Sequence, residues 1–195
     1  MFWRLTIAVI VMTTAGCSTT AVPLGHAPAA NVAGSMAPAL PMVVGSFQDA
    51  RNARDERWIG AIHGEFGNAV ATLHADVPVS DLVRNAFVDA LKARGIAADA
   101  RRVGARLEGR IITLECDQSV RREATIKIEL VIRDANGIET FTRSYASSRV
   151  DRSPLSFSTR VFGSTDEVRA VMDKTLRDTV ERALNDSALR AALQV

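Results

Sequence analysis

The sequence contains few of the residues on which catalysis and metal binding most often depend. Its 195 residues include two cysteines and three histidines, and their spacing matches no structural zinc motif. No Gly-x-Ser-x-Gly nucleophile elbow occurs. The glycines at 60, 64 and 67 are not followed by Lys-Ser or Lys-Thr, so they do not form a phosphate-binding P-loop. The sequence therefore predicts no catalytic residue, no metal site and no cofactor.

Two further features are missing, namely an excess of one charge and a long apolar run. Lys and Arg number 24 against 22 Asp and Glu, a formal net charge of +2, which gives no support to nucleic-acid binding. The apolar run Leu5 to Met12 is well short of the roughly 20 residues that a membrane-spanning helix needs. The hydrophobic fraction of 47% suits one globular domain preceded by a targeting segment.

The first residues have the layout of a secretory signal, in which a positive charge at Arg4 precedes the apolar run. Thr14-Ala15-Gly16-Cys17 then resembles the bacterial lipobox, although the family usually has Leu where Thr14 stands. The resemblance implies cleavage before Cys17 and transfer of a diacylglyceryl group to its sulfur. The alternative is an ordinary signal peptide in which Cys17 is unmodified.

A lipid on Cys17 predicts where the mature chain is held. We expect residues 1–16 to be a signal peptide and the remainder to face the periplasm. Ser18 resembles an outer-membrane address, since retention in the inner membrane usually calls for Asp at that position. The expected location is therefore the inner leaflet of the outer membrane. With Cys17 consumed by a thioether, Cys116 has no disulfide partner and is expected to be a buried thiol.

The chain after Cys17 divides by composition into a linker and a domain. Residues 17–40 are rich in Ala, Pro, Gly, Ser and Thr, with prolines at 23, 28 and 38 and no apolar periodicity. This composition predicts a flexible linker. Residues 41–195 are expected to form a single periplasmic domain.

Apolar periodicity within that domain predicts an α+β fold. A helix is expected to start at 79–81, capped by Ser80, and to stop at Arg94-Gly95. A longer helix begins near Ser164, and a short one covers 188–193. Strands are predicted at 42–47, 58–63, 69–75, 105–116, 123–133 and 138–147, the last two joined by a turn at Asn136-Gly137. We expect an antiparallel sheet of about four to six strands with two main helices packed on one face.

Several polar residues invite a functional interpretation. Glu115 and Asp117 suit a general acid and base, yet at i, i+2 before a turn they are better explained as a solvated rim. In the hairpin, His63 is expected to face Val70 and His74 to face Ile59, so the two histidines do not meet.

Arginines 101, 102, 106, 110, 121 and 122 are expected around one end of the sheet. There they suit either contact with an anionic lipid, lipopolysaccharide or peptidoglycan, or, as we favour, a strand edge protected by charge.

The order of these segments resembles the YajG-like bacterial lipoproteins. The resemblance is carried by the lipobox, the Ala/Pro-rich linker, the first strand, the helix Leu82 to Gly95 with its Lys92-Ala93-Arg94-Gly95, the strand pair around Asn136-Gly137, Tyr145-Ala146-Ser147 and the final helix running into Asn185-Asp186-Ser187. It implies an envelope address and an α+β fold. A similar layout occurs in auxiliary lipoproteins of ABC-type lipid transporters.

The function expected from these features is a noncatalytic binding or envelope-assembly module whose ligand the sequence does not identify. Its expected partners are the membrane, through Cys17, and an envelope protein or lipid. The alternatives are an auxiliary lipoprotein of a lipid transporter and, third, a hydrolase.

Overall fold

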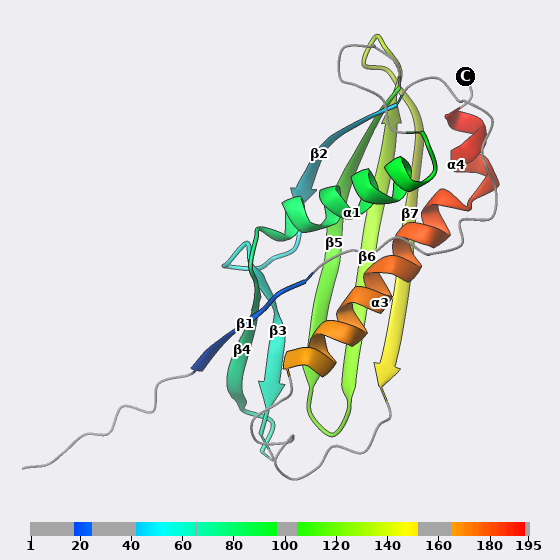
Figure 1. The fold of residues 1–195 in the computed structure, drawn as a ribbon. Coiled ribbons are helices and arrows are strands. Elements are labelled where there is room, and N and C mark those ends of the chain that lie inside the picture. Colours follow the sequence, from blue (N-terminus) through cyan, green and yellow to red (C-terminus); the bar gives the residue numbers. More distant parts are fainter. Residues whose placement is uncertain (1–17, 25–41, 65, 97–104, 152–164, 194–195) are drawn as a thin grey trace, which may run out of the picture.

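The computed structural model describes residues 18–24, 42–64, 66–96, 105–151 and 165–193. In this part of the chain a seven-stranded sheet is covered on one face by helices (Figure 1). The strands are β1 (Ser18–Val22), β2 (Val43–Asp49), β3 (Trp58–His63), β4 (Ala69–Ala75), β5 (Arg106–Gln118), β6 (Arg122–Arg133) and β7 (Glu139–Asp151). The helices are α1 (Val79–Ala93), α3 (Thr165–Leu184) and α4 (Ser187–Ala192).

The sheet is mixed, which corrects the expected purely antiparallel arrangement. Its order is β1-β4-β3-β5-β6-β7, and β2 pairs with the first half of β5, ahead of the point where β3 joins it. The pairs β3–β4, β5–β6 and β6–β7 are antiparallel, whereas β1–β4, β2–β5 and β3–β5 are parallel. Parallel neighbours need a crossover connection, and β4 with α1 supplies it between β3 and β5. The α+β class itself is confirmed.

The strand β6 shows why one face of the sheet is covered. Ile126, Ile128 and Leu130 are fully buried, while Lys127 between them is exposed. This alternation places the apolar residues under the helices and the polar residues on the open face. The turn that follows closes as expected, since the Asp134 N–H donates to the Ile138 carbonyl at 2.9 Å and Gly137 has a φ of 81°.

Helix α1 packs on β2 through two aromatic rings. Phe87 and Phe47 are stacked with their centroids 5.3 Å apart. The Phe47 ring fits because β5 has a glycine beneath it, and a Cβ at Gly109 would lie 2.3 Å from that ring.

The ends of α1 test two expectations. The helix stops at Gly95, whose φ is 70°, as predicted. Its start differs, because Pro78 occupies the N-cap position and no side chain caps the helix. The Val79 N–H instead donates to the Glu56 carbonyl at 2.9 Å, so Ser80 is not the cap. None of the helices in the described ranges is long and apolar enough to cross a membrane.

Arg51 fills a gap in the sheet where β2 ends and β3 has not yet begun. Its guanidinium donates to the Leu114 carbonyl of β5 at 2.9 Å and to the Trp58 carbonyl at 2.7 Å. It is also paired with Asp49, through Nε at 2.8 Å and Nη2 at 2.7 Å. With its side chain only 5% exposed, Arg51 joins three strands that have no direct ladder at this point.

The strand β1 corrects the expectation of a flexible linker over 17–40. Ser18–Val22 pairs in parallel with β4, from Ser18 opposite Ala71 to Val22 opposite Ala75. Val22 is fully buried and Leu24 packs against the core. The linker interpretation is therefore wrong for 18–24, because the free edge of β4 and the buried valine hold this segment. Residues 25–40 lie outside the described residues.

Candidate functional site

The first candidate site is the sheet edge that receives the N-terminal segment. Cys17 lies outside the described residues, but it is joined by one peptide bond to Ser18, so their Cα atoms are about 3.8 Å apart. Ser18 is paired with Ala71 of β4. A lipid carried by Cys17 is consequently attached directly beside the folded body, with no intervening linker.

The second candidate is the carboxylate pair on the open face of β5. Burial, and then the charge of Asp117, raise the pKa of Glu115 above its ordinary value. His63 Nε2 lies 3.5 Å from Asp117 Oδ1, in a pair whose side chains are 30% and 53% exposed. Solvent screens an ion pair of this exposure, which agrees with the solvated rim expected from the sequence.

The histidines remain apart, as expected, although their pairing differs in detail. The predicted register is correct for Gly60, Ala61 and Ile62, but irregularities at both ends of the ladder place His63 opposite Ala69 and His74 opposite Trp58. His74 Nδ1 lies 3.0 Å from Asp55. Within the described part of the chain, no three His, Cys, Asp or Glu side chains are grouped as metal ligands would be.

Cys116 is a buried free thiol, as predicted. Its side chain is fully buried, and burial, followed by the charge of Asp117, raises the pKa of Cys116 to about 12. Because the thiolate is the reactive form, this cysteine is inert near neutral pH.

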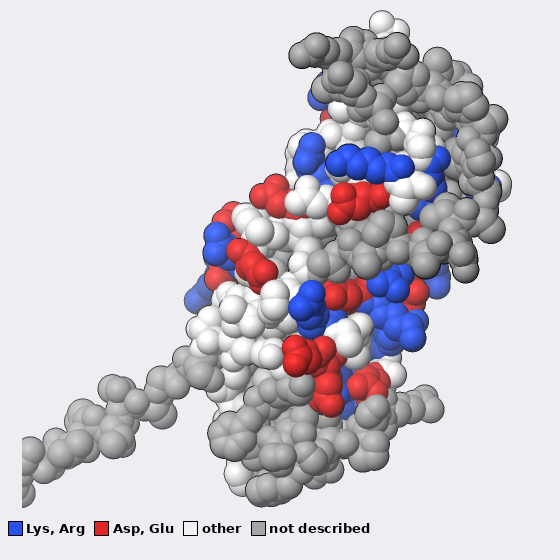
Figure 2. All heavy atoms as spheres, viewed as in Figure 1, with Lys and Arg blue, Asp and Glu red and all other residues white. Residues whose placement is uncertain are grey.

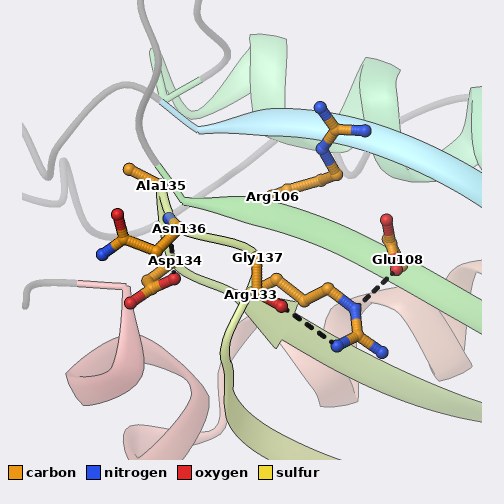
Figure 3. Close-up of a pocket in the computed structure, with 7 residues that line it drawn as sticks. All are labelled: Arg106, Glu108, Arg133, Asp134, Ala135, Asn136 and Gly137. Atoms are coloured by element: carbon orange, nitrogen blue, oxygen red, sulfur yellow. Dashed lines mark hydrogen bonds and ion pairs between the residues drawn. The ribbon is translucent and has the colours of Figure 1, made fainter.

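A third candidate is a polar hollow beside the β6–β7 turn, with a volume of about 280 Å³. It is lined by Arg106, Glu108 and residues 133–137 (Figure 3). Arg133 donates from Nε to Glu108 at 3.1 Å and from Nη1 to the Gly137 carbonyl at 3.2 Å. The backbone of Arg106 is paired in the sheet, whereas its side chain makes no hydrogen bond or ion pair with another described residue. The hollow thus offers one guanidinium with no partner among the described residues, which alone does not define a ligand.

The structure separates the basic residues that were expected around one end of the sheet. Arg106 and Arg110 lie near the start of β5, close to the β6–β7 turn, whereas Arg121 and Arg122 follow its far end. Residues 101 and 102 lie outside the described residues. On the face shown in Figure 2, Lys and Arg are interspersed with Asp and Glu. A single basic patch at one sheet end is therefore ruled out for the described arginines.

Arg122 is also not a surface residue, since its side chain is 1% exposed. It donates to Gln118 at 2.8 Å and to Asp151 at 2.9 Å, and it is paired with Glu167. Arg94 is similarly buried and joins α1 to α3 through Glu181 at 2.6 Å. These arginines, with Arg51, are structural, and the sequence carried no signal that separated them from exposed ones.

Two of the patches that carry the family resemblance meet in space. Tyr145 donates to Asp186 Oδ2 at 2.7 Å, and Arg143 donates to the same oxygen at 2.8 Å. Asp186 also caps α4 by accepting from the Ala188 N–H at 2.9 Å. The hydrogen bond from Tyr145, then that from Ala188, holds the pKa of Asp186 below its ordinary value. The pair therefore fixes α4 against β7.

Sequence comparison places the chain among known proteins. A family model described as uncharacterized lipoprotein matches residues 46–194. The chain belongs to this lipoprotein family. No curated protein matches the sequence of the lipoprotein.

Two crystal structures share the fold of the lipoprotein. Protein XCC0632 from Xanthomonas campestris has a TM-score of 0.59 and 19% identity, covering 86% of this chain and 92% of that chain. A second, of an uncharacterized protein, has a TM-score of 0.54 and 12% identity, covering 89% of this chain and 97% of that chain. At these identities the likeness establishes the fold alone.

Proposed function

We propose that this lipoprotein is anchored by lipid on Cys17 to the inner leaflet of the outer membrane, where it acts as a noncatalytic binding or assembly module facing the periplasm. The observation that carries the proposal is the start of β1 one residue after Cys17. Cleavage before Cys17 leaves β1 whole. Cleavage only a few residues later removes part of a strand that contributes the fully buried Val22 to the core.

The noncatalytic part of the proposal is supported by the polar groups of the open sheet face. Glu115, Asp117 and His63 are partly exposed there and surround no buried nucleophile, since Cys116 points to the opposite face. Lys127 and Glu129 continue this polar face on β6. A mixed-charge surface of this kind can be matched by complementary charges on another protein, which gives an interface specificity more than affinity.

We assign the chain more finely to the YajG-like lipoproteins. The support is the contact between Tyr145 and Asp186, which joins the two sequence patches of the resemblance into one structural feature.

An auxiliary lipoprotein of an ABC-type lipid transporter is the second candidate, and it requires space for acyl chains. Between the helices and the sheet, Phe87, Ile128 and Leu130 are each fully buried and pack in one core. This packing favours the binding module. Lipid extraction of the purified protein, followed by mass spectrometry, separates the two: stoichiometric lipid beyond that bonded to Cys17 favours the transporter component.

The anchor is tested by metabolic labelling with palmitate and by cell fractionation. We expect the wild-type chain to incorporate label and to fractionate with the outer membrane, and Cys17→Ser to lose both properties. Cys116→Ser is the matched control, because that buried thiol takes no lipid and its variant keeps the label. Equal labelling of the wild type and Cys17→Ser would refute the anchor.

The binding role is tested by site-specific photocrosslinking in intact cells. A photoreactive amino acid replaces Lys127 on the open sheet face or Lys174 on the exposed side of α3. We expect a defined envelope protein to be trapped from position 127 and not from position 174. If neither position traps a partner, the proposed module has no binding surface on the sheet.

A further inference from the structure

The parallel pairing of β1 determines which end of the molecule lies nearest to the anchor. β1 and β4 run in the same direction, so Ser18, the first residue of β1, lies near the start of β4. It is paired with Ala71, and β4 begins two residues earlier, at Ala69. The β3–β4 turn precedes Ala69, so its tip lies at this end. β5 is parallel to β3, which brings the β5–β6 turn to the same end. Figure 1 shows both turns opposite the β6–β7 turn.

This anchored end, defined by the β3–β4 turn and the β5–β6 turn, exposes large apolar side chains. Phe66 at the tip of the β3–β4 turn is 96% exposed, and Val120 in the β5–β6 turn is 77% exposed. Val70, where β4 begins, is 37% exposed. An aromatic ring that is almost entirely in water at a turn tip loses apolar hydration when it enters a membrane interface.

The strands next to the anchor also lack charge. β1, β3 and β4 contain no Asp, Glu, Lys or Arg. In the sequence from 58 to 75 Glu65 is the one charged residue, and it lies outside the described residues. By contrast, β5 alone carries Arg106, Glu108, Arg110, Glu115 and Asp117. The edge formed by β1, β3 and β4 can approach a bilayer without desolvating ions. The β5–β6 turn does carry Arg121, with Asp117 and Glu123 beside it, and all three are exposed. Because these charges are of both signs, they give no net attraction to anionic lipid.

We propose that the anchored end is a second membrane contact, in which Phe66, supported by Val120, inserts into the bilayer interface beside the lipid on Cys17. This inference rests on the proposed lipid anchor and adds a defined orientation to it. The β3–β4 turn faces the bilayer. The β6–β7 turn points into the periplasm, about 40 Å away for a twelve-residue strand. The side chains that insert are apolar, so neutral headgroups suffice.

The test places a fluorophore at either end of the lipidated protein. Phe66→Cys and Ile138→Cys each introduce one accessible thiol, because Cys116 is buried and Cys17 is blocked by its thioether. Ile138 is the matched control, since it is a 62% exposed apolar residue at the opposite turn. Each labelled protein is reconstituted into zwitterionic vesicles, with and without an anionic lipid, and is quenched by lipid-borne nitroxide or by aqueous iodide.

We expect quenching by lipid-borne nitroxide to be several-fold greater at position 66 than at position 138, and quenching by iodide to be greater at position 138. Neither kind of quenching should change when anionic lipid is added. Equal lipid quenching at the two positions would overturn the membrane contact, as would the reverse order or a dependence on anionic lipid. Flotation of the protein with the vesicles distinguishes failure of the membrane contact from failure of the lipid anchor. A wild-type protein that does not float with vesicles contradicts the lipid on Cys17, whereas one that floats with position 66 in water contradicts the contact alone.

Discussion

Arg51→Met is expected to destabilise the fold strongly, although it changes a single loop residue. The guanidinium donates to the carbonyls of Leu114 and Trp58 and forms two hydrogen bonds with Asp49. Methionine keeps much of the aliphatic volume and removes all of these donors. The side chains of Arg51 and Asp49 are 5% and 20% exposed, so little water is available to replace the lost partners.

The expected loss follows from this burial. Removing one partner of a buried ion pair costs about 3–5 kcal/mol, a large part of a typical total stability of about 5–15 kcal/mol. With a urea slope of about 2 kcal/mol/M, the unfolding midpoint should fall by about 2 M. Arg54→Met is the control, because Arg54 is exposed in the same loop. Equal midpoints for the two variants would refute the bridging role of Arg51.

The same pair predicts a dependence on pH. The hydrogen bond from Arg51 holds the pKa of Asp49 below its ordinary value, against the opposing effect of burial. A carboxyl with a depressed pKa in the folded state contributes stability that is present above its unfolded pKa of about 3.9. That contribution is lost as the pH falls through the folded pKa. Urea midpoints measured downward from neutral pH should therefore decline more steeply below about pH 4 in the wild type than in Arg51→Met. Parallel declines would contradict the coupling.

Three further substitutions or reactions test the packing. Gly60→Ala should lower the free energy of unfolding by about 2–5 kcal/mol, because φ at Gly60 is 146° and a Cβ there would lie 1.9 Å from the Cys116 carbonyl oxygen. Gly67→Ala is the control and should cost only about 1 kcal/mol, since Gly67 has a φ of 76° but open space around it. Equal losses for the two variants would show that the clash is not the cause. Phe87→Ala should cost about 3–5 kcal/mol in urea unfolding, since its ring is fully buried against Phe47, and a loss near zero would contradict that packing. Alkylation of Cys116 by iodoacetamide should be much slower in the folded than in the unfolded protein. The side chain is fully buried, and burial raises the pKa of Cys116, which lowers the fraction of reactive thiolate. Comparable rates would show an accessible thiol.

Local sequence patterns predicted most of the elements. The strands β3 and β4 have the bounds that their apolar, β-compatible stretches and the turn residues between them indicated, and the turn at Asn136-Gly137 closes as its residues require. What failed was pairing between distant segments. Parallel contacts of β5 with β2 and β3 depend on crossovers, and no local periodicity encodes them.

The strand β1 was missed because composition obscured a short signal. Thr19, Thr20 and Val22 are β-branched residues that favour strands, and they end at Pro23, which suits the end of an edge strand. Alanines and prolines further along made the whole segment look like a linker. Five residues are too few for such a pattern to stand out, and the free edge of β4 that stabilises them lies 53 residues further along the chain.

The buried arginines show a second limit. Arg122 and Arg121 are adjacent in sequence, yet one side chain is buried and the other is exposed. The difference depends on Asp151 and Glu167, which arrive from β7 and α3. Charged residues are buried only where partners compensate their desolvation, so the sequence of one strand cannot identify them.

The central claim is that lipid on Cys17 holds a domain whose fold starts at the next residue. It is tested most directly by mass spectrometry of the N-terminal peptide of the mature protein isolated from cell membranes. The account predicts a chain that begins at Cys17 with a diacylglyceryl group on its sulfur. A mature chain that begins beyond residue 17, or one whose Cys17 carries no lipid, would contradict it.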